Sequence, residues 1–336
     1  MSTSTVVDPA TSNAPEAAAA SRARFASLVQ RQGALAIFVV VVAVASVSFD
    51  TFASRGNLTG IAVQASFLAM LALGMTFVIM TGGIDLSVGS VFALGGVLAA
   101  WGSQHGTLVA FVLPLAVCGA IGLTQGLIIA RGGLPPFIVT LAGLLFARGL
   151  LLLLSDEGAT TYKVPRGSAF RKLAQGELFG IPYPVLLVVL FFAIGALVLH
   201  RTSYGASVLA IGGQEDAADL MGLPVQRTKV LTYVASSLLA GFGGIMIASY
   251  TSSGVTILGV GTELEAIAAV VLGGTLLTGG AGTVLGTLIG VLLLQVIKNV
   301  INQIGSLDSD WQSVVSGTIL LLVVTLQRWL TRVDRT

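Results

Sequence analysis

LAMLALGMTFVIMTGGIDLSVGSVFALGGVLAA, residues 68–100, is the stretch that decides the fold class of this chain. Most of its positions are apolar or small, and Asp85 is its only charged residue. An apolar helix needs about 20 residues to cross a bilayer. The stretch therefore predicts two membrane-spanning helices, one on each side of a break at Thr81-Gly82-Gly83.

The composition of the whole chain agrees with a membrane location. Of the 336 residues, 55% are hydrophobic and only 10% are charged, and the mean hydropathy is +0.95. A soluble domain carries about 25% charged residues, so a soluble enzyme and a disordered chain are both excluded. The 42 glycines against 9 prolines fit closely packed membrane helices. A net charge of +2 gives no indication of nucleic-acid binding.

Apolar runs long enough to span a bilayer recur along the chain. Ten are found, at residues 34–50, 58–80, 84–101, 107–130, 135–154, 184–200, 228–250, 262–280, 282–304 and 312–330. Several are interrupted by glycine, and half-helices would change the number to nine or eleven. The expected fold is all-α, a polytopic membrane protein of about ten transmembrane helices that include broken or half-helices.

A weak internal echo indicates a pseudo-repeat of two bundles. Leu73-Gly74-Met75-Thr76 precedes Thr81-Gly82-Gly83, and Leu272-Gly273-Gly274-Thr275 precedes Thr278-Gly279-Gly280. Repeats are common in transporters, although apolar glycine-rich sequence also produces such echoes by chance.

Basic residues near the span ends set the expected orientation, because Lys and Arg collect in cytoplasmic loops. With ten spans, both termini lie on one face. The basic residues of this face are Arg22, Arg24, Arg31, Arg131, Arg201, Arg227, Lys229, Arg328, Arg332 and Arg335, so it is expected to be cytoplasmic. Arg55 and the four basic residues of the 155–183 loop fall on the other face, so the bias is not clean.

The spans divide the chain into three parts. Residues 1–33 are rich in Ser, Thr, Ala and Pro and are expected to be a disordered cytoplasmic tail. Residues 34–330 form the transmembrane domain, with a structured outer loop at 155–183 and an inner loop at 201–229. Residues 331–336 are expected to be a cytoplasmic C-terminus.

The break after Gly83 has two compatible interpretations. An Asp at membrane depth is costly unless it caps a helix or pairs, and side-chain oxygens of Asp85 and Ser87 could cap the following helix. The break could also shape a translocation path, because irregular backbone at membrane depth is tolerated where it lines a cavity.

The inner loop carries the signals of a short helix at residues 214–221. Glu215 and Asp216 suit a helix N-terminus, and Gly222 and Pro224 stop the helix. Small residues leave one of its faces shallow, so the helix could lie on the membrane surface and fit a cleft of a partner. A tethered surface helix without a partner is the alternative.

Several kinds of chemistry are absent from the sequence. No lysine follows a glycine, so a phosphate-binding loop is missing, and there is no Gly-x-Ser-x-Gly or His-Glu-x-x-His arrangement. A single cysteine, Cys118, excludes an intrachain disulfide and a Cys-rich metal site. We therefore expect no catalytic residues, no metal site and no energy source within this chain.

Four segments together resemble the permease subunits of bacterial ABC sugar importers of the ribose/xylose/galactofuranose type. They are Thr81–Ser90, Leu134–Leu141 followed by Ala147-Arg148-Gly149, the Arg201–Gly222 loop and the run Gly261–Gly280. The resemblance spans about residues 58–330. Ser155-Asp156-Glu157, together with the C-terminal motifs Leu307-x-Ser309-x-Trp311 and Leu326-Gln327-Arg328, looks most like the galactofuranose-type permease.

The resemblance implies roles for particular residues. The 201–229 loop would hold the coupling helix that transmits motion from an ATPase subunit, through Arg201, Gly205, Gly212, Glu215, Asp216, Ala217, Ala218 and Gly222. The translocation path would involve Asp85, Ser87, Phe137 and Thr140. Pro135 and Pro136, near the start of the Leu134–Leu141 segment, are expected to begin a helix.

The resemblance also implies partners and a location. The chain would bind no cofactor itself, since ATP and Mg would act in the ATPase subunit. It would work in the bacterial inner membrane with a periplasmic sugar-binding protein, a second permease that is either an unlike homologue or a second copy, and membrane lipid, and it would import a hexose, galactofuranose-like sugar or pentose. The alternatives are an ion-coupled secondary transporter or facilitator, and a permease for a nucleoside or another small polar solute.

Overall fold

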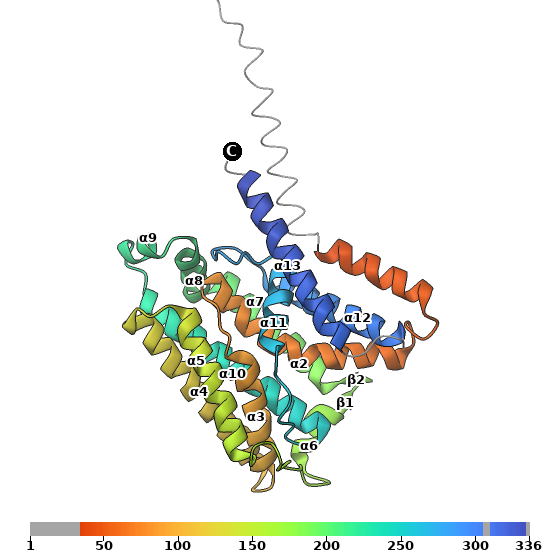
Figure 1. Ribbon diagram of the computed structural model, residues 1–336. Coiled ribbons are helices and arrows are strands. Elements are labelled where there is room, and N and C mark those ends of the chain that lie inside the picture. The colour runs from red at the N-terminus through yellow and green to blue at the C-terminus, as the bar shows by residue number, and fades with distance from the viewer. Residues whose placement is uncertain (1–33, 305–309, 334–336) are drawn as a thin grey trace, which may run out of the picture.

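The computed structural model describes residues 34–304 and 310–333 of the chain. The described part is a bundle of helices with one small hairpin (Figure 1). After a first helix at Ala34–Ser48, the helices are α2 (Arg55–Met80), α3 (Val88–Ser103), α4 (Thr107–Gly132), α5 (Pro136–Leu154), α6 (Ala169–Gln175), α7 (Tyr183–Arg201), α8 (Ser203–Gly213), α9 (Glu215–Leu220), α10 (Val225–Thr251), α11 (Thr262–Leu272), α12 (Val284–Ile304) and α13 (Asp310–Val333). The strands β1 (Glu177–Leu178) and β2 (Ile181–Pro182) pair antiparallel.

The all-α, polytopic membrane class is confirmed. Within the described ranges, 6 helices are long and apolar enough to cross a membrane, namely α2, α4, α5, α7, α10 and α12. Each coincides with a predicted span. The helix Ala34–Ser48 and α3 are apolar but shorter, and the predicted span 312–330 falls within α13. The tail at 1–33 and residues 334–336 lie outside the described residues.

The predicted span at 262–280 is corrected to a half-helix. Its helical part, α11, has 11 residues, and a helix of that length rises only about 16 Å, roughly half the thickness of the hydrocarbon core. Residues 273–283 are not helical. Gly274, Gly279 and Gly280 there have positive φ angles, which residues with a Cβ rarely adopt. The span predicted at 84–101 likewise begins later, at Val88.

The core of the bundle forms around α2 and α10. In α2, 94% of the most apolar stretch is buried, against 22% in α5. Close packing of α10 on α3 depends on glycine, because a Cβ added at Gly95 would lie 2.9 Å from the Gly241 Cα atom. Small residues of this kind allow membrane helices to approach closely. Because so little of α5 is buried, most of its surface is exposed at the outside of the bundle.

The two long connections lie at opposite ends of the bundle, where α6 and the hairpin are at the bottom of Figure 1 and α8 and α9 at the top. The 155–183 loop contains α6, β1 and β2. It is held to the end of α10, where the main-chain N–H of Val164 donates to the Ser252 carbonyl at 3.0 Å and that of Ala174 donates to Ser249 Oγ at 3.1 Å. The 201–229 loop folds into α8, α9 and the first turn of α10.

Candidate functional site

The carboxylate of Asp85 joins the break after α2 to the middle of α10. Asp85 is 0% exposed. Its Oδ1 atom accepts hydrogen bonds from the main-chain N–H of Ser87 at 2.9 Å and from the Ser87 hydroxyl at 2.6 Å. Its Oδ2 atom accepts from the Ser236 hydroxyl at 2.9 Å. Three hydrogen bonds replace part of the hydration that a carboxylate loses on burial.

The expected helix cap is therefore only partly correct. Ser87 precedes α3 at the N-cap position, but its hydroxyl makes no capping hydrogen bond. The reason is that this hydroxyl is turned toward Asp85. Asp85 accepts a hydrogen bond from the main-chain N–H of Ser87, whereas a capping side chain would accept one from a main-chain N–H within α3.

A glutamine of α4 extends the polar contacts around Asp85. The side-chain amide of Gln125 lies 3.2 Å from the Ser87 hydroxyl. A hydroxyl has a single proton, and that of Ser87 is committed to Asp85 over the shorter distance. The Gln125 oxygen, at 3.2 Å, is therefore only a secondary acceptor for this proton, and the Gln125 NH2 group packs against Gly143 of α5 without a hydrogen-bond partner among the described residues.

Two more buried polar groups complete this cluster, Tyr233 Oη and Ser237 Oγ of α10. Among the described residues neither has a hydrogen-bond partner. Each instead packs against a glycine, because a Cβ at Gly83 would collide with Tyr233 Oη and one at Gly122 would lie 2.7 Å from Ser237 Oγ. We call Asp85, Ser87, Gln125, Tyr233, Ser236 and Ser237 the buried polar cluster. It fixes the break, α4 and α10 against one another.

The predicted path residues of α5 occupy different environments. Thr140 is buried, and its hydroxyl donates to the Pro136 carbonyl at 2.9 Å and approaches the Ile84 carbonyl at 3.2 Å. It therefore connects α5 to the same break. Phe137 is 54% exposed. Pro136 is the first residue of α5, as the proline pair predicts.

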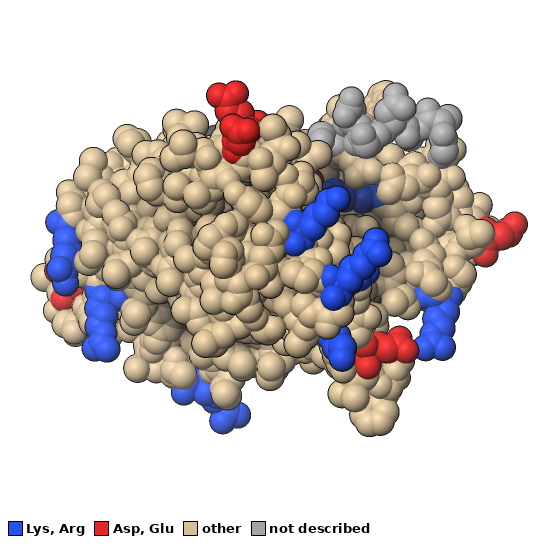
Figure 2. Space-filling view, turned by 90° about the horizontal axis from the view of Figure 1, so that it is seen from below, with Lys and Arg blue, Asp and Glu red and all other residues tan. Residues whose placement is uncertain are grey.

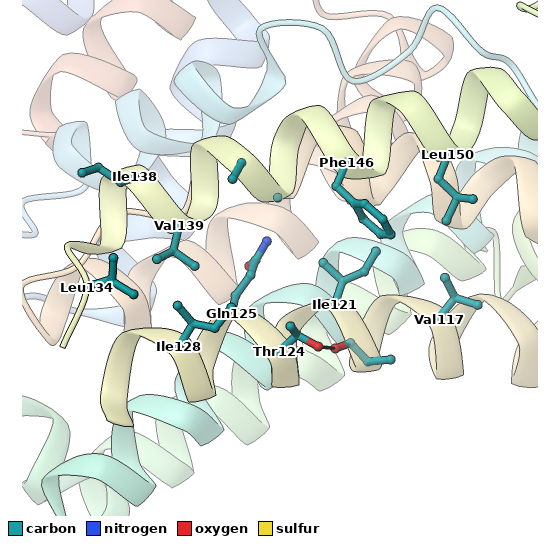
Figure 3. Close-up of a pocket in the computed structure, with 13 residues that line it drawn as sticks. Val117, Ile121, Thr124, Gln125, Ile128, Leu134, Ile138, Val139, Phe146 and Leu150 are labelled. Atoms are coloured by element: carbon teal, nitrogen blue, oxygen red, sulfur yellow. Dashed lines mark hydrogen bonds between the residues drawn. The ribbon is translucent and has the colours of Figure 1, made fainter. Parts of the chain in front are cut away.

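A hollow of about 620 Å³ lies between α4 and α5 next to the buried polar cluster (Figure 3). Gln125 points into it from α4, between Ile121 and Val139. Its lining is otherwise almost entirely aliphatic or aromatic, with Thr124 as the other polar side chain. Sugars need many hydrogen-bond partners, so this hollow suits an apolar occupant.

The two echoed Thr-Gly-Gly motifs meet in space. The main-chain N–H of Gly280 donates to the Met80 carbonyl at 3.0 Å, and a Cβ at Gly279 would lie 2.8 Å from the Gly82 nitrogen. Gly212, near the end of α8, packs on the same point, since a Cβ there would collide with both the Met80 carbonyl and the Gly280 nitrogen. The inner loop thus touches both breaks directly.

The short helix predicted at 214–221 is present as α9. Glu215 and Asp216 lie in its first turn, and Gly222 after it has a φ of 78°. Gln214 is the N-cap residue but makes no side-chain capping bond. The ammonium group of Lys229 pairs with the Glu215 carboxylate at 2.6 Å and so attaches the start of α9 to α10.

The residues expected to form the coupling surface of α9 differ in exposure. Ala218 is fully buried against Ile211 and Val225. The exposed apolar side chains are those of Leu220, 90% exposed, and Met221, 71% exposed. Sequence reasoning missed both, although an apolar pair next to a helix stop in a polar loop was a visible signal.

The remaining predicted coupling residues lie around α8. Arg201 is the exposed last residue of α7, and Ala217 is half-buried. Gly205 is buried, and a Cβ there would collide with the Leu199 carbonyl. The Tyr204 hydroxyl shares a hydrogen bond of 2.8 Å with Thr232 Oγ1, and burial raises the pKa of Tyr204, so the phenol stays neutral.

The half-helix α11 carries an ion pair at its start. The Lys298 ammonium of α12 pairs with Glu265 at 2.6 Å. The guanidinium of Arg148 in α5 donates to the Thr256 carbonyl at 2.9 Å and the Leu258 carbonyl at 3.2 Å, which holds the segment that leads into α11. Acids in the first turn suit the helix dipole.

The described structure is that of a multi-pass helical membrane protein with glycine-rich breaks at two helix ends and a short helix on one face. The chain belongs to the family described as branched-chain amino acid transport system / permease component, which matches residues 57–324. It is accordingly a permease component and not an enzyme.

Curated relatives cover nearly the whole chain. The inner membrane ABC transporter permease protein YjfF of Escherichia coli K12 is 42% identical over 304 residues, which are 88% of this chain and 91% of the relative. The ribose import permease protein RbsC of Bacillus subtilis is 38% identical over 309 residues, 91% and 95% of the two chains. The L-arabinose ABC transporter permease protein AraH of Azospirillum brasilense is 36% identical over 324 residues, 95% and 94%. No solved structure matches the chain significantly.

Proposed function

We propose that this chain is the membrane-spanning permease subunit of an ATP-binding-cassette importer that carries a monosaccharide into the cytoplasm. A separate ATPase subunit supplies the energy, with ATP and Mg bound there. The support for the class is that relatives named as ribose and L-arabinose permeases align over about nine-tenths of the chain. A galactofuranose-like substrate is a narrower proposal, based on Ser155-Asp156-Glu157 and the C-terminal motif.

The contact between Gly212 and the two breaks is the observation that carries this proposal. A movement imposed on α9 passes through Gln214 to the end of α8, and Gly212 there touches Met80 and Gly280. Packed elements shift between discrete arrangements rather than deform continuously. A rigid displacement of α8 would therefore move the end of α2 and the break between α11 and α12 together. A subunit outside the membrane domain that drives transport needs a connection of this kind.

The exposed tip of α9 is the surface that we propose for the ATPase subunit. Leu220 and Met221 project from it, and Asp216 and Asp219 are exposed beside them. Buried apolar anchors with a polar rim are typical of protein interfaces. This side of the molecule would be cytoplasmic, with both termini on it.

The opposite face would receive the periplasmic sugar-binding protein. Figure 2, which views the side of α6 and the hairpin, shows Lys and Arg side chains gathered along a hollow. The path would run along the exposed side of α5 that carries Phe137, against a second permease chain. Asp85, Ser87 and Thr140 would position the inner end of α5 rather than contact sugar, because all three are buried.

Reconstitution of transport tests the proposal. The permease is placed in vesicles with the ATPase subunit and the sugar-binding protein that copurify with it, and uptake of labelled ribose, arabinose and galactofuranose is measured. We expect uptake only with ATP and all subunits. Uptake driven by an ion gradient without the ATPase subunit would instead establish a secondary transporter.

A further inference from the structure

A second hollow, of about 590 Å³, lies between the end of α4 and the start of α10, beside the segment that follows α9. We call it the inner hollow. Its lining combines aliphatic side chains with two arginines, Arg131 of α4 and Arg227 of α10. It is separate from the contact between Gly212 and the breaks, and of the residues at the exposed tip of α9 it includes Asp219 but neither Leu220 nor Met221.

Both helices arrange the lining in the same order along the membrane. On α4, Leu123, Leu127 and Arg131 line the hollow at intervals of four residues, which places them on one face of the helix. They extend over about 12 Å at 1.5 Å per residue. On α10, Leu231 and Arg227 also line the hollow at an interval of four residues. Arg131 lies at the end of α4 and Arg227 at the start of α10, so both arginines lie at helix termini. The hollow is thus apolar toward the bilayer centre and basic at its boundary.

The charges of the inner hollow are not neutralised within the described part of the chain. The ion pairs among the described residues are Glu215–Lys229 and Glu265–Lys298. Within the described ranges, therefore, no carboxylate lies within ion-pairing distance of Arg131 or Arg227. Asp219 also lines the hollow, which leaves two positive charges against one negative. Guanidinium groups bind phosphate in a bidentate manner.

We propose that the inner hollow binds one anionic phospholipid, with its phosphate between Arg131 and Arg227 and an acyl chain along Leu123, Leu127 and Leu231. A basic pocket between membrane helices, at the level of lipid head groups, is a site of this kind. The apolar length excludes a free phosphate ion as the intended ligand. Leu223 and Pro224, directly after α9, also line the hollow, so the lipid would brace α9 against α4.

Lipid retention tests the proposal on the full-length permease in nanodiscs of phosphatidylcholine with phosphatidylglycerol. The permease is then released from the nanodiscs, and native mass spectrometry measures how much phosphatidylglycerol stays bound to it. At about 1 kcal/mol for each basic residue near the head groups, loss of one arginine weakens binding roughly fivefold and loss of both about 30-fold. We expect that loss in the Arg131→Gln/Arg227→Gln variant, together with faster hydrogen exchange at residues 219–225.

Arg201→Gln is the matched control, because it removes an arginine from the same face outside the inner hollow. An equal loss of lipid in Arg201→Gln would show general surface electrostatics and overturn the proposal. So would equal slowing of exchange by sodium phosphate without lipid, which would indicate a free anion site. Unchanged lipid retention in the double variant, with loss of the copurifying ATPase subunit, would assign the hollow to that protein. None of these outcomes depends on whether the chain imports sugar.

Discussion

The main-chain N–H of Gly280 and the carbonyl of Met80 form a hydrogen bond of 3.0 Å that joins the non-helical segment between α11 and α12 to the end of α2, 200 residues earlier in the sequence. Gly212 of α8 packs on this hydrogen bond. The three segments leave no room for a side chain at their meeting point. Because one segment belongs to the inner loop, this point connects the inner loop directly to both breaks.

Replacement of Gly212 should therefore damage both stability and transport. In Gly212→Ala the added methyl group collides with the Met80 carbonyl, and overpacking of this kind typically costs about 1–3 kcal/mol. We expect a lower thermal unfolding temperature in detergent and weak ATP-dependent uptake. Gly213→Ala is the control, since nothing lies within 4 Å of a Cβ there. Equal behaviour of the two variants would show that the contact is unimportant.

Two neighbouring serines of α10 allow a sharp test of the buried polar cluster. Ser236 and Ser237 are both fully buried, but only Ser236 bonds to Asp85. Ser236→Ala leaves a carboxylate oxygen without its donor and should lower the free energy of unfolding by about 1–3 kcal/mol. Ser237→Ala removes a hydroxyl that has no hydrogen-bond partner within the described ranges and should be neutral or slightly stabilising. Thermal unfolding of both variants in one detergent distinguishes them, and a greater loss in Ser237→Ala would contradict this account of the cluster.

Hydropathy was sufficient to predict the membrane class and most spans, because apolar length alone determines which segments can cross a bilayer. It failed at 262–280, where the run is apolar after Glu265 but helical only to Leu272. Glycines with positive φ end the helix there, and hydropathy does not report backbone conformation. The partners of Asp85 were not predictable either, since Ser236 is 151 positions away. Local patterns predicted α9 but not which of its faces is buried.

The tip of α9 should bind the ATPase subunit through Leu220. This side chain is 90% exposed, so Leu220→Ser should leave the fold of the permease intact. Loss of an interface anchor commonly costs about 2 kcal/mol or more, or roughly 30-fold in affinity. We expect less ATPase subunit to copurify, at unchanged unfolding temperature. Phe179→Ser, at a residue 95% exposed on the opposite face, is the control. Ala218→Arg would be less informative, because Ala218 is buried and its replacement should displace the whole helix.

The pair of Lys298 and Glu265 should matter for the half-helix α11, because the side chains are only 16% and 25% exposed. Lys298→Met leaves the Glu265 carboxylate without its counter-charge in a poorly hydrated place. The loss in stability should be about 2 kcal/mol, below the 3–5 kcal/mol typical of a fully buried broken pair. The double variant Glu265→Gln/Lys298→Met removes both charges and should recover most of this loss, since an uncharged pair needs no compensation. If the double variant unfolds at the same temperature as Lys298→Met, the cost arises from packing of the lysine stem against α11 and not from the ion pair.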